Sequence, residues 1–507
     1  MGRRRWGSVD LAMKGRPLST VHCRQWVGVL ASPIGNRGVR YGKHQWTAFL
    51  LIMTTLFLLS KVTDLSAQDA DNHYNATLKE TLERIETTFH VTLHYDGKLV
   101  DGKELDYAFW RIRQGDLDNS LTAVLAPFDL TYYQEDEDTY SIKPFQYHKK
   151  SISIAKEELA FFETLYATKM AWEDRKSQLR QCMIEALGLL ALPEKPSSAP
   201  IITKKRKYKG YTVENVALEV LSGVYTTGSV YKPRPLKDNH PIIIMPNGHF
   251  GQGRYRESEQ IRAATLAKMG AVVVTYDLFA WGESQLQFAS EDHRLSAAHT
   301  IQTWNGLQWI DYLSALKETD PQRVGITGGS GGGSQTMLLT AIDDRIKVAV
   351  PTVMVSSHFS GGCPCESGKP IHLCAGGTNN AEIAAMAAPR PMLVISDGGD
   401  WTHTVPELEF PFIQRTYGFY GEKDKVTNAH FPSEGHDYKY SKRQAMYPFM
   451  AKYLDLDIDK LKDDEGYIDE SGVTIEDENA LKVFGENGDG LPENAIKGKD
   501  ALFNVME

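Results

Sequence analysis

The sequence contains a serine with two glycines on each side, Ser330 at the centre of Gly-Gly-Ser-Gly-Gly at 328–332. An apolar run at 324–327 precedes it, and helix-like apolar residues follow at 336–339. A strand that turns sharply through a serine into a helix exposes the hydroxyl as a nucleophile, and glycine tolerates the backbone of such a turn. The pattern predicts attack of the Ser330 oxygen on a carbonyl carbon, although a glycine-rich run alone also fits a flexible loop.

Two aspartates compete for the role of the acid that supports this serine. Both follow the strand-like run at 391–396, and a loop after a parallel strand lies at the functional edge of a sheet. Asp397 stands in Asp-Gly-Gly, which is strong turn chemistry. We therefore favour Asp400 as the acid and interpret Asp397 as a turn residue.

His436 is the candidate base among 15 histidines. It lies in the polar loop at 433–438, after a run at 426–431 that suggests a last strand and before helix-like residues at 445–454. The chain order Ser330, Asp400, His436 is the serine, acid, histidine order of α/β-hydrolases. Such a histidine takes the serine proton and returns it to the leaving group, while the acid fixes its tautomer. The alternative is a surface histidine in a polar loop.

The backbone near the serine predicts an oxyanion hole of two N–H groups. One is the N–H of Gly331, directly after the nucleophile. The other should follow the strand-like run at 241–245, where the sequence reads Pro-Asn-Gly-His-Phe-Gly at 246–251. We expect the N–H of His249 here, with that of Phe250 second. Alternatively, the side chains of His249 and Asn247 only hold the loop together.

Residues 205–455 resemble an α/β-hydrolase of the acetyl xylan esterase and dienelactone-hydrolase-like group. The stretch Asp-Leu-Phe-Ala-Trp-Gly-Glu-Ser at 277–284 is similar to the D-x-x-G-x-G-E-S loop of such hydrolases, except at Ala280 and Trp281. Further likeness lies at 311–313, 320–325, 388–391, 399–402 and 435–443. The resemblance implies a doubly wound, mostly parallel α/β sheet and a serine esterase that needs no metal and no organic cofactor.

Esterases of this group often occur in bacterial polysaccharide-degradation systems, so the resemblance implies an acetyl or methyl ester on a plant or algal glycan as substrate. A methyl ester of a uronic acid is favoured if the pocket contains arginine or lysine. Two alternatives remain: a non-catalytic periplasmic glycan sensor, and a serine peptidase, against which the lack of a preceding propeller gate argues. The candidate substrate-binding residues are Phe250, Arg254, Trp281, His358, Glu366 and Trp401.

The composition is ordinary for a globular protein of two or more domains, with 507 residues, 42% hydrophobic and 24% charged. The formal net charge of −9 argues against nucleic acid as the main partner. It does not exclude an acidic glycan, since local basic residues such as Arg254 and Arg256 could bind one; their alternative is a solvated surface. We expect a carbohydrate ester as the partner.

The N-terminal region predicts export. Residues 47–60 form a short apolar block that follows basic residues, and small residues up to Ala67 precede polar ones. This is the order of a secretory signal peptide with cleavage near Ala67, and the block is shorter than the ~20 residues that span a bilayer. We expect residues 1–67 to be a signal region and the protein to be periplasmic or secreted, with no stable membrane span. An uncleaved anchor is the alternative.

Residues 75–146 predict a small α/β module that resembles the secretin and TonB short N-terminal domain. Helix-like segments at 78–89 and 116–125 alternate with strand-like runs at 91–95, 130–133 and 139–142. The resemblance implies a periplasmic protein partner or a glycan-sensing role; the alternative is an accessory domain that only packs. We expect a helical connector and linker at 150–200, the catalytic domain at 205–455 and an acidic C-terminal extension at 456–507 that wraps this domain.

Three of the five cysteines, Cys363, Cys365 and Cys374, cluster after the strand expected at 348–355. A zinc site would require a fourth ligand and better spacing, so we expect no metal. Export permits disulfides, and a bridge from Cys363 or Cys365 to Cys374 is one option, with Cys182 buried in a helix. We interpret the segment as a pinned lid loop at the serine's edge of the sheet, from which His358 and Glu366 could reach the substrate.

Overall fold

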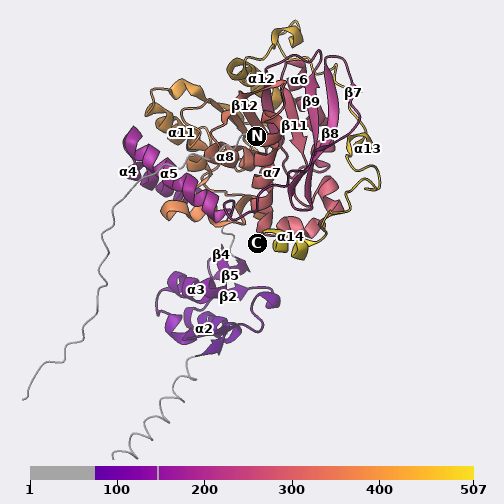
Figure 1. Ribbon diagram of the computed structural model, residues 1–507. Coiled ribbons are helices and arrows are strands. Elements are labelled where there is room, and N and C mark those ends of the chain that lie inside the picture. Colours follow the sequence, from indigo (N-terminus) through magenta and orange to yellow (C-terminus); the bar gives the residue numbers. More distant parts are fainter. Residues whose placement is uncertain (1–74, 129, 145–147, 507) are drawn as a thin grey trace, which may run out of the picture. The chain divides into compact units, whose positions relative to one another are not determined.

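The computed structural model describes residues 75–128, 130–144 and 148–506. Contacts divide the chain into two compact units, residues 1–145 and 146–507 (Figure 1). The predicted signal region lies outside the described residues. Among the helices that are described, none combines the length and the apolar character needed to cross a bilayer.

The first unit packs two helices, α2 (Leu78–Phe89) and α3 (Leu117–Leu125), with a small sheet. Thr77 and Glu80 form a capping box that begins α2. Apolar residues at helical spacing along α2 are buried in the core of this unit. Both helices predicted from the sequence are therefore present. The strands are β2 (Thr92–His94), β5 (Thr139–Pro144) and β4 (Leu130–Asp136), in this order, with β1 (Ala76–Thr77) paired to β3 (Glu104–Leu105).

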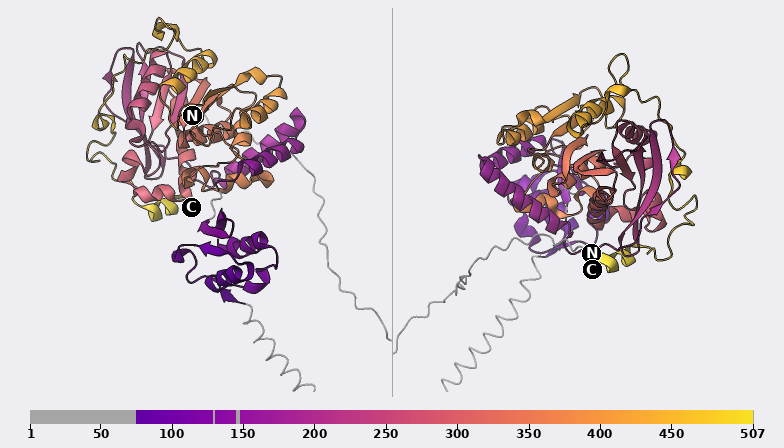
Figure 2. Two further views of the ribbon diagram at one scale, coloured as in Figure 1. Left: turned by 180° about the vertical axis from the view of Figure 1, so that it is seen from behind. Right: turned by 45° about the horizontal axis from the view of Figure 1, so that its top comes forward.

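The second unit is built on a ten-stranded sheet. Figures 1 and 2 show this sheet with helices around it. Its parallel part has the order β15 (Val426–Phe431), β14 (Met392–Asp397), β13 (Ile346–Thr352), β12 (Thr319–Gly329), β10 (His240–Pro246) and β11 (Val272–Tyr276). The antiparallel part continues with β9 (Val224–Pro233), β8 (Tyr211–Leu221), β6 (Ile201–Ile202) and β7 (Arg206–Lys207), the last of which pairs with β8. This confirms the predicted doubly wound, mostly parallel sheet.

Both faces of the sheet are buried. Along β10, Ile242 and Ile244 belong to one hydrophobic core and Ile243 and Met245 to the other, because side chains alternate along a strand. Helices cover the two faces, as expected for parallel strands. They are α6 (Glu257–Lys268), α7 (Ala297–Ser314), α8 (Gly331–Ile342), α10 (Asn380–Ala385), α11 (Glu409–Gly418) and α12 (Tyr440–Leu454).

The helices expected as a connector, α4 (Ile152–Leu165) and α5 (Lys169–Ala186), pack into the second unit. Phe162 and Trp172 belong to the same core as Ile242 and Ile244. A disulfide joins Cys182 in α5 to Cys374, 192 residues further on. The bridge suggested from Cys363 or Cys365 to Cys374 is therefore not the one formed, because the fold brings α5 to Cys374.

The acidic C-terminal extension lies along the antiparallel strands. The side chain of Asn215 in β8 donates to the carbonyl of Ala480, at 2.9 Å, and the N–H of Ile496 donates to the carbonyl of Gly223, at 3.0 Å. The extension contains α13 (Glu478–Leu481) and α14 (Lys499–Met506). The extension thus adds contacts to the antiparallel end of the sheet, the end opposite β15 in the strand order.

Candidate active site

The parallel strands end at one edge of the sheet, and the predicted site residues follow these ends. The loop after β10 contains His249, β12 ends directly before Ser330, Asp400 follows β14 and His436 follows β15. Because the carboxyl ends of parallel strands meet at one edge, residues far apart in sequence gather there.

Ser330 occupies a strained turn between β12 and α8. Its backbone has φ 56° and ψ −123°, a combination that costs about 1–3 kcal/mol and that concentrates at functional sites. The flanking glycines are required by space: a Cβ at Gly332 would lie 2.2 Å from the carbonyl oxygen of Pro246, and one at Gly328 would lie 2.5 Å from the same oxygen. The glycine pattern therefore forms a sharp strand-to-helix turn, whose geometry is typical of a nucleophile elbow.

His436 is oriented by Asp400. The Nδ1 atom of His436 lies 2.6 Å from Oδ2 of Asp400, whose side chain is 3% exposed. Thr402 also donates to Asp400 through both its backbone N–H and its hydroxyl. Burial alone would raise the pKa of Asp400, but the hydrogen bonds from His436 and Thr402 hold this pKa below its ordinary value. The carboxylate is thus kept ionised beside the imidazole.

Asp397, the competing aspartate, has a different partner. Its carboxylate accepts from the ammonium of Lys442 at 2.9 Å, and both side chains are fully buried. It also accepts from the backbone N–H of Gly399, as a turn aspartate does. Asp397 therefore holds the loop that contains Asp400.

The loop after β10 lies against the elbow. A Cβ at Gly248 would lie 2.3 Å from the carbonyl oxygen of Gly329, so only glycine allows this approach. The side chain of Asn247 donates to the carbonyl of Tyr276, at 2.6 Å, and ties the loop to the end of β11. Gly331 is the first residue of α8, so its N–H has no partner within the helix. The N–H of Ser330 is already used, since it donates to the carbonyl of Thr352 at 3.0 Å. The oxyanion hole of the Gly331 and His249 N–H groups stays a prediction.

A cavity of about 870 Å³ contains Ser330 and His436 in its lining. Four of the six predicted substrate-binding residues, Phe250, Trp281, Glu366 and Trp401, also line it. The rings of Phe250 and Trp401 contact that of His436, with centroids 5.5 and 4.6 Å away. The imidazole of His436 is therefore set between two aromatic side chains.

The other two predicted substrate-binding residues lie elsewhere. His358 does not line the cavity; its Nδ1 atom lies 3.1 Å from the hydroxyl of Ser356 and 3.9 Å from the carboxylate of Glu409. Arg254 is completely buried. The sequence places Arg254 in a polar loop two residues before Arg256, and nothing in this pattern indicates that its guanidinium is buried.

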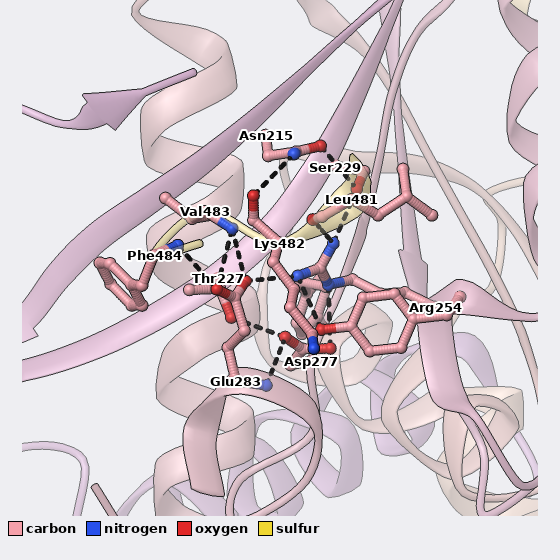
Figure 3. Close-up of polar contacts among 12 residues, drawn as sticks. Asn215, Thr227, Ser229, Arg254, Asp277, Glu283, Leu481, Lys482, Val483 and Phe484 are labelled. Carbon is pink, nitrogen blue, oxygen red and sulfur yellow. Dashed lines mark hydrogen bonds and ion pairs between the residues drawn. The ribbon is translucent and has the colours of Figure 1, made fainter. Parts of the chain in front are cut away.

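Arg254 forms the centre of a buried ion-pair network (Figure 3). Its guanidinium donates to Asp277 at 2.9 Å and to Glu283 at 2.7 Å, and it also reaches the carbonyl of Leu481 in the C-terminal extension at 2.6 Å. Glu283 in turn accepts from the N–H of Phe484. Burial disfavours the charged form, yet the carboxylates of Asp277 and Glu283 raise the pKa of Arg254 above its ordinary value. The stretch at 277–284 therefore fastens the extension to the sheet.

We expect Arg254→Met to lower the free energy of unfolding by about 3–5 kcal/mol, because it leaves two buried carboxylates without their cation. The matched control is Arg256→Met. Arg256 is half-buried and stacks on Phe250, so its loss should cost about 1 kcal/mol or less. Urea unfolding of both variants measures the difference. Equal costs would show that the network does not stabilise the unit.

Two comparisons with known proteins bear on this site. A family model described as X-Pro dipeptidyl-peptidase (S15 family) matches residues 223–385. Methylesterase BT1017 is 51% identical in sequence, with a TM-score of 0.73, over 85% of this chain and 96% of that chain. The chain belongs to the family of methylesterase BT1017.

Membership of the methylesterase BT1017 family makes the chain a carboxylic ester hydrolase with an α/β-hydrolase fold, as predicted from the sequence. A glucuronoyl esterase from Solibacter usitatus is 14% identical, with a TM-score of 0.39, over 53% of this chain and 91% of that one. Uncharacterized protein PA2218 of Pseudomonas aeruginosa is 28% identical over 132 residues, which are 26% of this chain and 34% of that protein. The chain thus spans about a third of that curated relative.

Several residues of the cavity were not predicted. Some come from the segment of Cys363 and Cys365, which was expected at this edge of the sheet, and the others come from segments to which the sequence gave no chemical role. Lys149 precedes α4, and Phe359 contacts the ring of Trp401 with centroids 4.1 Å apart. No local motif could have found the residues of these other segments, because their place in the cavity depends on how distant loops meet. They are His148, Lys149, Gln285, Ser290, His293, Arg294, Phe359, Gly362 and Cys363.

Proposed function

We propose that this protein is an exported serine esterase that removes methyl esters from uronic acid residues of a plant or algal glycan. The observation that carries the proposal is that Ser330, in its strained elbow, and His436, oriented by Asp400, line one cavity. The name of methylesterase BT1017, a member of the same family, supports the ester chemistry.

In the proposed reaction, the Ser330 oxygen attacks the ester carbonyl carbon while Nε2 of His436 takes the hydroxyl proton. The N–H groups of Gly331 and His249 stabilise the oxyanion of the tetrahedral intermediate. Collapse breaks the bond to the methoxy group, which leaves as methanol with the proton from His436. Water then attacks the acyl-enzyme in the same way and releases the uronate.

Asp400 has the electrostatic role in both halves of this reaction. Its carboxylate faces Nδ1 of His436 at 2.6 Å, which directs Nε2 toward the serine and stabilises the imidazolium that forms. A lowered pKa of Asp400 fits this role, because the acid must stay ionised while the base is charged.

The charges around the cavity favour a uronic acid over a neutral sugar. Lys149 and Arg294 line the cavity and are both exposed, so they can meet the carboxylates of an acidic glycan next to the ester. The chain as a whole has a net charge of −9. Two cations at one cavity therefore stand out against the overall charge and indicate local recognition of an anion.

We expect the double variant Lys149→Ala/Arg294→Ala to raise KM for a methyl-esterified galacturonan by roughly 3- to 10-fold, as the loss of two exposed ion pairs predicts. The KM for neutral para-nitrophenyl acetate should stay within about twofold. The difference should shrink as salt rises, because exposed charges are screened. Equal effects on both substrates would mean that these cations do not select the acidic glycan.

Export is supported by the predicted signal region and by the disulfide between Cys182 and Cys374, because structural disulfides persist in oxidising compartments. A periplasmic protein partner of residues 75–146 remains part of the proposal. Fractionation of cells that produce the full chain tests export: the proposal requires the mature protein to begin after residue 67 and to lie outside the cytoplasm. A full-length chain in the cytoplasm would contradict it.

The family model for X-Pro dipeptidyl-peptidases favours a peptidase as the second candidate. Its reaction would use the same serine and histidine, so the substrate distinguishes the two. Incubation with methyl-esterified galacturonan, acetylated xylan and a Gly-Pro para-nitroanilide separates methanol, acetate and nitroaniline release. Methanol as the main product supports the proposal, whereas nitroaniline or acetate as the main product favours another substrate.

A further inference from the structure

Two histidines and two cysteines from three separate segments converge at the wall of the cavity that Ser330 and His436 also line. Their ligand atoms, one from each side chain, lie within 4.8 Å of one another. They belong to the loop after β10, to the 3₁₀ turn η6 (Ser290–Arg294), and to the start of α9 (Pro364–Ser367). We propose that His249, His293, Cys363 and Cys365 bind one zinc ion.

The donor set is one that zinc prefers. Two imidazole nitrogens and two thiolates make a tetrahedral S₂N₂ site, which is typical of structural zinc. The Nε2 atom of His249 lies 2.9 Å from Nε2 of His293 and 3.1 Å from Sγ of Cys365. A tetrahedral ion would set such atoms roughly 3.3–3.8 Å apart, so its entry needs these two separations to grow by only a few tenths of an ångström.

The Nδ1 atom of His293 forms a hydrogen bond on the far side of its ring, and that of His249 has a carboxylate nearby. Nδ1 of His293 lies 2.6 Å from the carbonyl oxygen of Phe279, to which it donates. This hydrogen bond fixes the tautomer that presents the Nε2 lone pair to a metal. Nδ1 of His249 lies 4.0 Å from the carboxylate of Glu366. The backbone carbonyl and the carboxylate are the outer partners that metal-bound histidines usually have.

The site is partly closed to solvent. His293 is 4% exposed and Cys365 is fully buried, while His249 and Cys363 are half-buried. The carboxylate of Glu366 accepts the N–H of Cys363 at 3.0 Å and fixes the turn that holds both sulfurs. Four protein ligands leave no open position, so we assign the ion a structural role and no part in the ester reaction.

The position of the site says what the ion would hold in place. A Cβ at Gly331 would lie 2.8 Å from the ring of His249, so this ring packs directly against the residue after the nucleophile. Zinc would join the loop of His249 to the segment that contains Cys363 and Cys365, which also lines the cavity. The inference goes beyond the proposed function and does not depend on the substrate.

The test begins with the metal content of the purified full chain. Mass spectrometry of the metals should find about one zinc per chain after gel filtration. Replacement by cobalt should give the visible absorption of tetrahedral cobalt together with sulfur-to-cobalt charge-transfer bands, which report thiolate ligands directly. A chain that holds no zinc and takes up no cobalt, or one with a disulfide between Cys363 and Cys365 in the mass spectrum, overturns the proposal.

Variants separate ligation from folding. We expect Cys365→Ser and His293→Gln to lower the zinc content at least tenfold, and His430→Gln to leave it unchanged. His430 is a suitable control because it is half-buried in β15 and hydrogen-bonds to Ser396 at 2.9 Å. If a ligand variant fails to fold, the wild-type chain decides: the thiols of Cys363 and Cys365, identified by mass spectrometry of the labelled peptides, should react with a thiol reagent only after a chelator has been added. Thiols that react at the same rate without the chelator contradict zinc binding.

Discussion

Ser330→Ala is expected to lower kcat for ester hydrolysis by between about 10⁴- and 10⁶-fold. The proposed reaction forms a covalent bond to the Ser330 oxygen, and loss of the nucleophile from such a triad leaves only the contribution of the oxyanion hole and of binding. The strained backbone at φ 56° stays in place, so the variant should fold. Initial rates with para-nitrophenyl acetate measure the loss, and circular dichroism checks the fold.

Ser334→Ala is the matched control for this variant. Ser334 lies one turn further along α8, is buried like Ser330, and its N–H donates to the carbonyl of Ser330 at 3.0 Å. We expect its substitution to change kcat by less than about threefold, because only its hydroxyl is lost. A Ser330→Ala enzyme that keeps more than about a tenth of the activity would contradict the role of Ser330.

Asp400→Asn is expected to lower kcat by about 10⁴-fold. The asparagine amide has the same shape as the aspartate side chain, but only one of its two orientations places its oxygen, an acceptor, toward Nδ1–H of His436. The substitution also removes the negative charge that stabilises the imidazolium. The expected change in KM is small, because Asp400 is nearly buried and is not among the residues that line the cavity. Steady-state kinetics on para-nitrophenyl acetate separates the two constants.

Asp397→Asn is the control that the chain itself offers, three residues earlier. Here the buried ammonium of Lys442 loses one carboxylate but keeps Asp437 at 3.1 Å. We expect a loss of stability of up to about 3 kcal/mol with kcat within about tenfold of the wild type. If Asp397→Asn inactivated the enzyme and Asp400→Asn did not, the two aspartates would have to exchange roles.

The fold and the core of the site follow from local signals in the sequence. Ser330 is bounded by glycines because the turn leaves no room for a Cβ, so the steric requirement is visible as a motif. Asp400 and His436 each follow an apolar strand, and the parallel sheet brings the ends of such strands together. Their order along the chain predicted that they would be neighbours, and their side chains lie 2.6 Å apart.

Contacts between distant segments could not be predicted in this way. His249 and His293 are 44 residues apart, and both lie far from Cys365 in sequence, so no ligand spacing appears in any one segment. Cys182 and Cys374 pair across 192 residues for the same reason. Arg254 was predicted to bind substrate, and this prediction missed its burial. The burial depends on the C-terminal extension, where the guanidinium donates to the carbonyl of Leu481.

The release of methanol from a highly methyl-esterified galacturonan tests the central claim most directly. Gas chromatography of the methanol and titration of the new carboxylates should give equal amounts with the wild-type chain, and neither product above background with Ser330→Ala. Acetylated xylan treated in parallel should release much less acetate. A wild-type chain that releases acetate but no methanol, or methanol release that persists in Ser330→Ala, would contradict the account.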